Sequence, residues 1–325
     1  MKPILHRARR NNKFIFYVKN YLKLLVPGSW LRRRREHILG SIHNYDAEHI
    51  TSRVNYYNQL TDPFTVNENA AGCFDLPFFK STIYTLDLLG VMRYFPQSYR
   101  FQYEYGDVID VFEQPTLVKS RPLSEKNSNS VLLKLNQVRH FNFITDPWKY
   151  HDKKPLLVWR GKAYQPHRKQ AMATLFGHPL CDVGQTNKTV KNSEWQCPEM
   201  SIYDQLGYKY ILCIEGNDVA SNLKWAMSSN SVCFMTKPKY ETWFMEGQLV
   251  AGKHYVELKS DYSDLEEKIS HYNQHPSQAL EIVSHAHDYV AQFKNQKRER
   301  LISLLVLEKY FQLSGQSKQS ASPEL

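Results

Sequence analysis

Short apolar runs alternate with segments of helical periodicity in the second half of the chain. Four apolar runs have the length of buried strands: 156–159, 210–214, 231–235 and 255–258. Five segments with helical spacing follow them: 168–176, 219–228, 240–247, 264–272 and 276–293. Alternation of strand and helix is typical of a parallel sheet with helices on both faces, so we expect a Rossmann-like domain here.

The first 37 residues combine an apolar helical face with many cations. The apolar residues share one face of a helix that Pro27-Gly28 ends: Phe14, Ile15, Val18, Tyr21, Leu22 and Leu25. Four consecutive arginines follow at 32–35. One interpretation is a helix that packs on its own domain, with the arginines in solvent. The other is an interfacial helix on an anionic membrane surface, helped by the arginines.

The rest of the first half is less regular. We expect a helix around 81–89, a strand at 100–105 and a strand-like stretch at 115–122. Asp107 follows the first of these strands, where it is either a turn residue or a carboxylate aimed into a cleft. The charged segment 149–154 separates the halves, so we predict domains at 1–150 and 151–295, then a C-terminal helix and tail at 296–325.

Cations and glycines follow the predicted strands of the second half. The run 156–159 ends on Arg160-Gly161, and Arg168 begins the next helix. The turn Glu215-Gly216-Asn217-Asp218 follows a central strand. Ligands bind beyond the carboxyl ends of such strands, and an Arg fork suits phosphate oxygens, so we expect an anionic, phosphorylated ligand. Alternatively, the arginines are surface or salt-bridged residues, and Lys224 is an exposed helix lysine.

Composition narrows the classes of protein without choosing one. With 42% hydrophobic and 23% charged residues the chain is ordinary globular material, and its formal charge of +10 favours nucleic acid, anionic lipid or a phosphorylated sugar. Five widely spaced cysteines without a CxxC pair indicate reduced thiols in the cytoplasm rather than a zinc cluster. We see no membrane-spanning segment and no signal peptide, so we expect neither membrane insertion nor secretion. Because the chain also lacks a GxGxxG motif, we do not expect it to bind NAD or FAD.

Three blocks, in order, resemble segments of glycosyl transferase family 90. Trp159-Arg160-Gly161 with Pro166-His167-Arg168 is similar to the family's FRG…PxR segment. Residues 208–217 with Lys224 are similar to KYLxxxxGN…K, and 240–244 with 254–261 to YYEWF…HYVPVKSDLSDL. The family includes protein O-glucosyltransferases, fungal capsule-associated enzymes and bacterial lipopolysaccharide glycosyltransferases. The sequences of 118–122 and 216–222 look most like those of the bacterial branch.

The resemblance implies an α/β GT-B architecture, in which two Rossmann-like domains face a cleft and the C-terminal domain holds a nucleotide sugar. It implies that two arginines contact the donor diphosphate and that other residues line the same pocket: Arg160 and Arg168, with Gly161, Gly216, Asn217 and Lys224. Asp107 aligns with the family's catalytic Asp. Eukaryotic members carry an arginine where this chain has Asn222, which shifts the expected phosphate contact to Arg168 or Lys224.

The expected reaction is the inverting transfer of glucose or galactose from a UDP-sugar to a lipopolysaccharide core. Asp107 would act as general base, while the arginines stabilise the leaving diphosphate. We expect no cofactor and no metal, because the chain has neither Asp-x-Asp nor HExxH. The partners would be the nucleotide sugar, the core acceptor and an anionic membrane surface, but no nucleic acid. The protein would be cytoplasmic, with peripheral attachment to the inner membrane as an alternative.

Two other functions remain open from the residues alone. Positive charge and 21 tyrosines suit a nucleic-acid-binding protein, which needs basic and aromatic side chains gathered on one face. The tyrosines here are scattered. A kinase acting on a lipid-linked sugar would use the same anion site, but it would need Mg²⁺, and the chain lacks a GxxxxGK[ST] loop.

Overall fold

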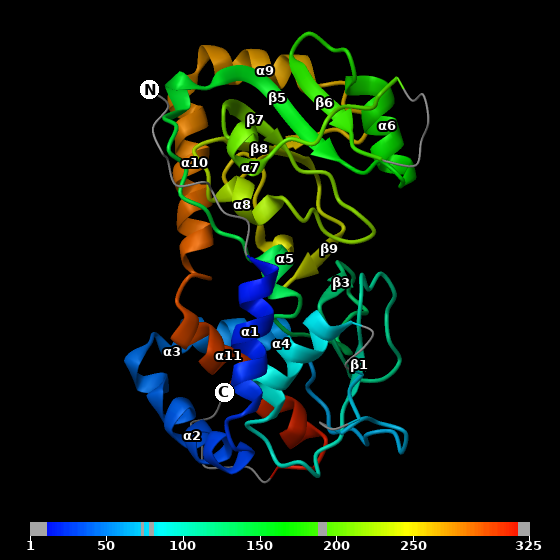
Figure 1. Ribbon diagram of the computed structural model, residues 1–325, viewed down its shortest axis with the longest axis vertical. Coiled ribbons are helices and arrows are strands. Elements are labelled where there is room, and N and C mark those ends of the chain that lie inside the picture. The colour runs from blue at the N-terminus through cyan, green and yellow to red at the C-terminus, as the bar shows by residue number, and fades with distance from the viewer. Residues whose placement is uncertain (1–11, 73–74, 78–80, 188–193, 318–325) are drawn as a thin grey trace. The chain divides into compact units, whose positions relative to one another are not determined.

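The computed structural model describes residues 12–72, 75–77, 81–187 and 194–317 (Figure 1). Cys73 therefore lies outside the described residues. The chain divides into two compact units, which we call unit 1 and unit 2. Among the described residues, unit 1 consists of those within 139–239 and 246–292, and unit 2 of those within 12–138, 240–245 and 293–317. The segments 240–245 and 293–317 thus group with residues from the first half of the chain.

Unit 1 contains a five-stranded sheet in the order β10-β8-β7-β5-β6, with every neighbouring pair parallel. The strands are β5 (Lys154–Gly161), β6 (Cys181–Gln185), β7 (Tyr208–Leu212), β8 (Val232–Thr236) and β10 (Val256–Leu258). The chain runs from β5 to β6 on one side and then returns to build β7, β8 and β10 on the other. This is the parallel α/β sheet that the alternating pattern predicts, and unit 1 is Rossmann-like.

Four helices of unit 1 contribute apolar side chains to one core with this sheet: η2 (Tyr150–Asp152), α6 (Pro166–Leu175), α9 (Leu265–Gln274) and α10 (Pro276–Ala291). Unit 1 also contains α7 (Ile202–Gln205), α8 (Leu223–Met227) and η3 (Glu246–Gln248). The predicted helix at 219–228 is reduced to the short α8. Pro166 and Pro276 stand at the first positions of α6 and α10, where a missing N–H costs nothing.

The helix predicted at 240–247 is wrong. Residues 240–242 form strand β9 (Tyr240–Thr242), which pairs antiparallel with β3 (Ser120–Pro122) in unit 2. Glu241 is buried there because its carboxylate accepts a hydrogen bond from Arg121 Nε at 2.8 Å. A turn follows, with Met245 at a φ of 55°. A distant ionic partner therefore outweighs the local helical spacing.

Unit 2 is richer in helix. It contains α1 (Lys13–Leu24), α2 (Gly28–Gly40), η1 (Ser41–Asn44), α3 (Ala47–Tyr57), α4 (Thr82–Met92) and α11 (Gln296–Leu313), and α5 (Gln137–His140) begins at its boundary. Its parallel sheet has the order β1-β2-β4, with β1 (Gln102–Glu104), β2 (Thr116–Val118) and β4 (Ser130–Leu132). Eleven of the 18 residues of helix α11 are buried and supply much of the core. Among the described residues, we find no helix whose length and apolar character would let it cross a membrane.

Candidate functional site

The loops after β5 and β7 form the topological switch point of the unit 1 sheet. From β5 the chain continues to β6 on one side, while β7 lies on the other side of β5. Ligands of open α/β sheets bind at such a point, beyond the carboxyl ends of the strands. Five of the seven predicted site residues lie in these loops or at their edges: Arg160, Gly161, Arg168, Gly216 and Asn217.

Arg168 joins the two loops of the switch point. It stands in the first turn of α6, and its guanidinium donates to three backbone carbonyls: Nε to Glu215 O at 2.7 Å, Nη2 to Ile214 O at 2.9 Å and Nη1 to Lys162 O at 2.9 Å. Its guanidinium carbon lies 5.7 Å from the centre of the Trp159 ring. Three of its five N–H donors are thereby occupied, so Arg168 braces the loops before any ligand arrives.

Burial has a measurable electrostatic consequence for Arg168. Loss of solvent, with a smaller contribution from Arg139, lowers the pKa of its guanidinium to about 10. The neighbouring His167 strengthens the same brace, because its Nε2 lies 2.9 Å from Glu215 O. The guanidinium still carries its positive charge at neutral pH, which adds positive potential to the switch point.

Arg160 reaches sideways from β5 toward β6. Its Nη1 donates to Asp182 O at 2.7 Å, and its Nη2 lies 2.5 Å from Asp182 Oδ1. Burial pushes the pKa of Asp182 upward, but hydrogen bonds from Tyr208 and Arg160 outweigh that effect, and the net pKa is lowered. The Arg160 side chain is only 9% exposed, so it links β5 to β6 in this structure.

The two predicted glycines differ in what they require. A Cβ on Gly161 would come within 2.6 Å of the Trp159 ring, too close for any side chain. A Cβ on Gly216 would lie 3.5 Å from Arg168 Nη2, which is an ordinary contact. Asn217 is exposed, and its side-chain oxygen accepts a hydrogen bond from Gln165 Nε2 at 2.9 Å across the two loops. Gly161 is therefore needed for packing, whereas Gly216 is not.

Lys224 is fully buried, so its interpretation as an exposed helix lysine is wrong. It lies on α8 with none of its surface exposed, and its Nζ forms an ion pair with Glu246 of η3, itself 1% exposed. In the described structure the ammonium stabilises the core of unit 1.

Four exposed lysines surround the switch point instead, following β5, β8 and β10: Lys162, Lys237, Lys239 and Lys259. Parallel strands place their carboxyl ends at one edge, so these lysines share the edge that holds the switch point. The Lys239 N–H donates to Glu215 Oε1 at 2.9 Å, which ties the loop after β8 to the loop after β7. Sequence reasoning misses Lys237 and Lys239, although a cation directly after a buried strand is a readable signal.

Asp107 lies in unit 2, after β1. Gly106 turns the chain with a φ of 109°, and Asp107 Oδ1 then lies 2.6 Å from Lys119 Nζ. Lys119 is 1% exposed, whereas the Asp107 side chain is 25% exposed. Ser120 Oγ accepts a hydrogen bond from the Val108 N–H at 3.2 Å, which fixes the loop. The arrangement gives an oriented carboxylate with one buried cationic partner and one accessible side.

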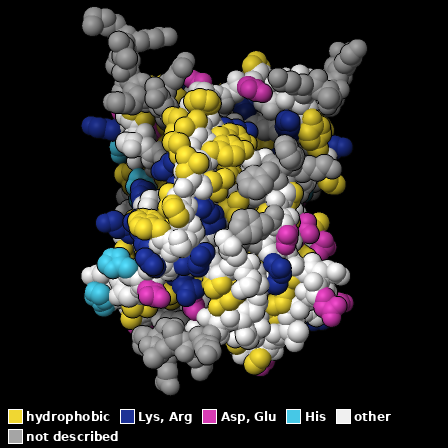
Figure 2. Space-filling view, turned by 60° about the horizontal axis from the view of Figure 1, so that its bottom comes forward, with side chains coloured by type: hydrophobic (Ala, Val, Ile, Leu, Met, Phe, Trp, Pro, Cys, Tyr) yellow, Lys and Arg dark blue, Asp and Glu magenta, His cyan; other side chains and the backbone are white. Residues whose placement is uncertain are grey.

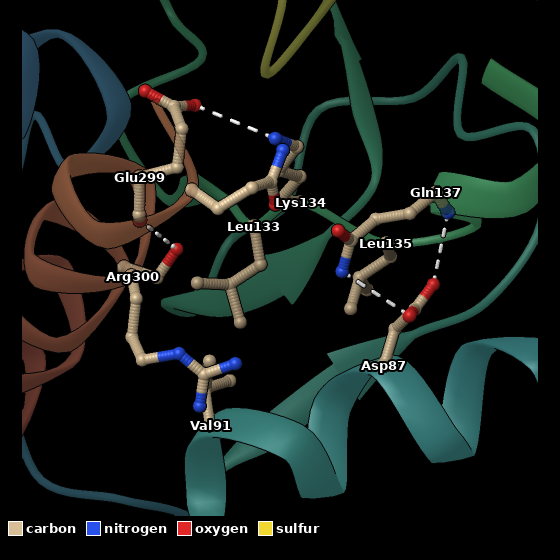
Figure 3. A pocket seen from close by; sticks show the side chains of 10 residues that line it. Asp87, Val91, Leu133, Lys134, Leu135, Gln137, Glu299 and Arg300 are labelled. Carbon is tan, nitrogen blue, oxygen red and sulfur yellow. Dashed lines mark hydrogen bonds and ion pairs between the residues drawn. The ribbon is translucent and has the colours of Figure 1, made fainter. Parts of the chain in front are cut away.

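A small polar pocket lies elsewhere in unit 2 (Figure 3). Its volume is about 60 Å³, enough for a few water molecules and too small for a sugar. Asp87 accepts hydrogen bonds from Gln137 N at 2.9 Å and Gln137 Nε2 at 3.2 Å, and Lys134 Nζ lies 3.6 Å from Glu299 Oε2. Burial raises the pKa of Asp87 to about 7. The pocket is a charged part of the core that sequence reasoning misses.

Within the described ranges, no three His, Cys, Asp or Glu side chains gather in a way that could hold a metal ion. The four described cysteines are free thiols: Cys181, Cys197, Cys213 and Cys233. Burial raises the pKa of Cys213 well above that of an ordinary thiol. Cys213 and Cys233 are buried core residues, whereas Cys181 and Cys197 are partly exposed.

Two comparisons with known proteins match this chain. The model of "Glycosyl transferase family 90" matches residues 131–318, which include α11 and all five strands of the unit 1 sheet. A protein of Dichelobacter nodosus named "O-glucosyltransferase LpsA" is 44% identical over 308 residues. That match covers 94% of this chain and 97% of the relative.

Proposed function

The chain belongs to glycosyl transferase family 90, and from this premise we propose that it transfers glucose from UDP-glucose to a hydroxyl of a lipopolysaccharide core. The observation that carries the proposal is the near full-length match to the O-glucosyltransferase of Dichelobacter nodosus. Family membership favours transfer over the nucleic-acid-binding and kinase alternatives. The GT-B arrangement that the resemblance implies stays a prediction.

For the donor we propose the carboxyl edge of the unit 1 sheet. The diphosphate of UDP-glucose needs cations that can approach it without breaking internal bonds, and the four exposed lysines meet that need. Arg168 adds its charge and its two remaining N–H donors. Arg160, Gly161, Gly216, Asn217 and Lys224 stay predicted pocket residues. The contacts of Arg160 and Lys224 support a role in shaping the pocket rather than touching the phosphates.

For the chemistry we propose inversion with Asp107 as the general base. The acceptor hydroxyl gives its proton to the Asp107 carboxylate, its oxygen bonds to the anomeric carbon, and the bond from that carbon to UDP breaks. Lys119 supports this role because its buried ammonium, 2.6 Å from Asp107 Oδ1, holds the carboxylate in place. The leaving diphosphate gains negative charge, which the lysines and Arg168 stabilise. We propose that the reaction needs neither metal nor cofactor.

The test compares two neighbouring carboxylates. Purified protein receives labelled UDP-glucose and a truncated lipopolysaccharide acceptor, with EDTA present. Asp107→Asn should slow transfer by roughly 10²–10⁴-fold, the usual contribution of a general base. Asp110→Asn changes an exposed residue of the same loop and should leave the rate unchanged. Equal rates for Asp107→Asn and the wild type would move the base elsewhere, and complete dependence on added metal would remove the cation-only mechanism.

The acceptor of this reaction is anchored in a membrane. We therefore also propose that the protein works at the cytoplasmic face of the inner membrane as a peripheral protein. The charge of +10 is suited to anionic lipid headgroups.

A further inference from the structure

Helix α1 turns its apolar face to solvent. Four large apolar residues, three in α1 and one directly after it, have between 59% and 79% of their surface exposed: Phe14, Ile15, Leu22 and Leu25. Val18 and Tyr21 on the same face are also exposed. Exposed apolar residues are ordinary when scattered, but a continuous helical face of them marks an interaction surface. We call these six residues the α1 face.

The opposite side of α1 holds the helix in place by polar contacts. Asn20 is the buried residue of the helix, and its Nδ2 donates to Phe16 O at 2.9 Å. Lys23 Nζ donates to Asn20 Oδ1 at 3.0 Å. Arg93, at the end of α4, donates to Lys23 O at 2.9 Å and to Val26 O. The helix therefore packs on its own unit, but with the side opposite to its apolar face.

The stretch of sequence that contains the α1 face is strongly basic. Residues 12–40 carry seven Lys and Arg and one acidic residue, Glu36. Arg33 and Arg34 of α2 are exposed, and the Arg34 guanidinium carbon lies 4.9 Å from the ring centre of Trp30, itself 49% exposed. Arg35 differs, because it pairs with Glu308 at 3.5 Å. On the side of the molecule that Figure 2 shows, exposed hydrophobic side chains lie beside lysine and arginine side chains.

We propose that the α1 face, with Trp30, Arg33 and Arg34, is a docking surface for an anionic phospholipid bilayer. The helix lies in the plane of the membrane, with Phe14, Leu22 and Leu25 at the boundary of headgroups and acyl chains. The arginines bind lipid phosphates, and Trp30 lies at headgroup level, where indole rings gather. The positive charge favours an anionic bilayer over a second copy of the chain, because a second copy would bring seven more cations against the first seven.

The experiment uses the full chain and phosphatidylcholine vesicles with or without phosphatidylglycerol. The wild type should sediment with the anionic vesicles, and Phe14→Glu/Leu22→Glu/Leu25→Glu should weaken that binding by at least about tenfold. The matched control is Leu123→Glu/Val250→Glu/Leu280→Glu, which places the same three charges on exposed apolar residues outside the α1 face and should bind like the wild type. Because all six residues are exposed, thermal unfolding should show that both variants fold.

A second variant separates charge from apolar insertion. Arg33→Gln/Arg34→Gln should lose affinity for the anionic vesicles, and added salt should narrow its difference from the wild type. The proposal fails if the triple α1 variant binds like the wild type, or if the wild type ignores anionic vesicles. It also fails if light scattering shows a dimer that only the triple α1 variant breaks, because a second copy would then occupy the surface. None of these readouts requires UDP-glucose or transfer.

Discussion

The switch point of unit 1 and helix α1 of unit 2 place their side chains in opposite ways. In unit 1, two cations that the sequence marks as ligand contacts point into the protein: Arg168 at the switch point donates to three carbonyls, and Lys224 of α8 pairs with Glu246. On α1, apolar residues point to solvent while Asn20 is buried. Charged side chains are thus buried in unit 1, whereas apolar side chains are exposed to solvent on α1.

The difference shows that partners decide where a side chain points. Backbone carbonyls at the carboxyl ends of β5 and β7 need donors, and Arg168 supplies three at once. Arg93 donates to the carbonyls of Lys23 and Val26 at the end of α1, which joins α1 to the end of α4. The groups left at the surface are then the ones available for function: lysines at the sheet edge and apolar residues on α1.

The largest expected effect is on stability and comes from replacing the buried Lys224. Lys224→Met should destabilise the protein by roughly 3–5 kcal/mol, because Glu246 would remain as a buried charge without its ammonium partner. Lys259→Met removes an exposed lysine and should change the free energy of unfolding by no more than about 0.5 kcal/mol. Urea unfolding measures both. Equal stabilities of the two variants would show that Lys224 is not a core residue and would contradict the difference between the two sites.

A buried carboxylate in unit 2 extends the comparison to pH. The folded-state pKa of Asp87 is about 7, above its ordinary value of 3.8, so the folded protein holds a proton that the unfolded chain has lost between those values. Stability from this group therefore falls as pH rises through that window. Between about pH 4 and pH 8, the free energy of unfolding should therefore fall by roughly 1–4 kcal/mol more in the wild type than in Asp87→Asn.

The Asp87 measurement is urea unfolding of the two proteins across that pH range. Asp62→Asn, at an exposed residue of unit 2, is the control and should keep the wild-type slope. A slope that Asp87→Asn leaves unchanged would show that the folded protein does not hold the extra proton at this residue.

Two glycines separate packing from binding at the switch point. Gly161→Ala should cost roughly 1–3 kcal/mol of stability, because its Cβ would overlap the Trp159 ring that lies beside Arg168. Gly216→Ala meets only an ordinary contact and should be much less destabilising. Thermal unfolding compares the two variants. A larger loss of stability for Gly216→Ala would reverse the assignment.

The outward lysines should affect binding and leave stability alone. Lys162→Ala/Lys237→Ala/Lys239→Ala should raise the Kd for UDP-glucose about tenfold, a change of about 1.4 kcal/mol. Lys126→Ala/Lys253→Ala/Lys294→Ala removes three exposed lysines from other places and should keep the wild-type Kd. Isothermal titration measures both. Equal losses in the two variants would mean that total charge, rather than this edge, attracts the donor.

The sequence predicts four strands of the unit 1 sheet because each of them is a local apolar run. It misses β6, whose Asp182 and Gln185 interrupt the apolar pattern, and it misreads β9, because Glu241 is buried by a partner 120 residues away. The side of α1 that faces outward depends likewise on packing against distant parts of the chain, such as α4. Helical spacing shows that α1 is amphipathic, but it cannot show which side faces the protein.

Site residues follow the same division between local and distant causes. The blocks around Arg160 and Gly216 are readable because the motifs are local, and Asp107 is readable as a carboxylate just after a predicted strand. The partners that determine what each residue can do come from elsewhere in the chain: Asp182 for Arg160, Glu246 for Lys224 and Lys119 for Asp107. Lys237 could have been identified from its position directly after a buried strand.

The most direct test of the proposed function is the mass of the acceptor. Purified protein, UDP-glucose and a truncated lipopolysaccharide core are incubated with EDTA, and the core is then measured by mass spectrometry beside a reaction with UDP-galactose. We expect the core to gain one hexose from UDP-glucose without added metal. An unchanged core from a folded protein that is given UDP-glucose, with or without metal, would contradict it.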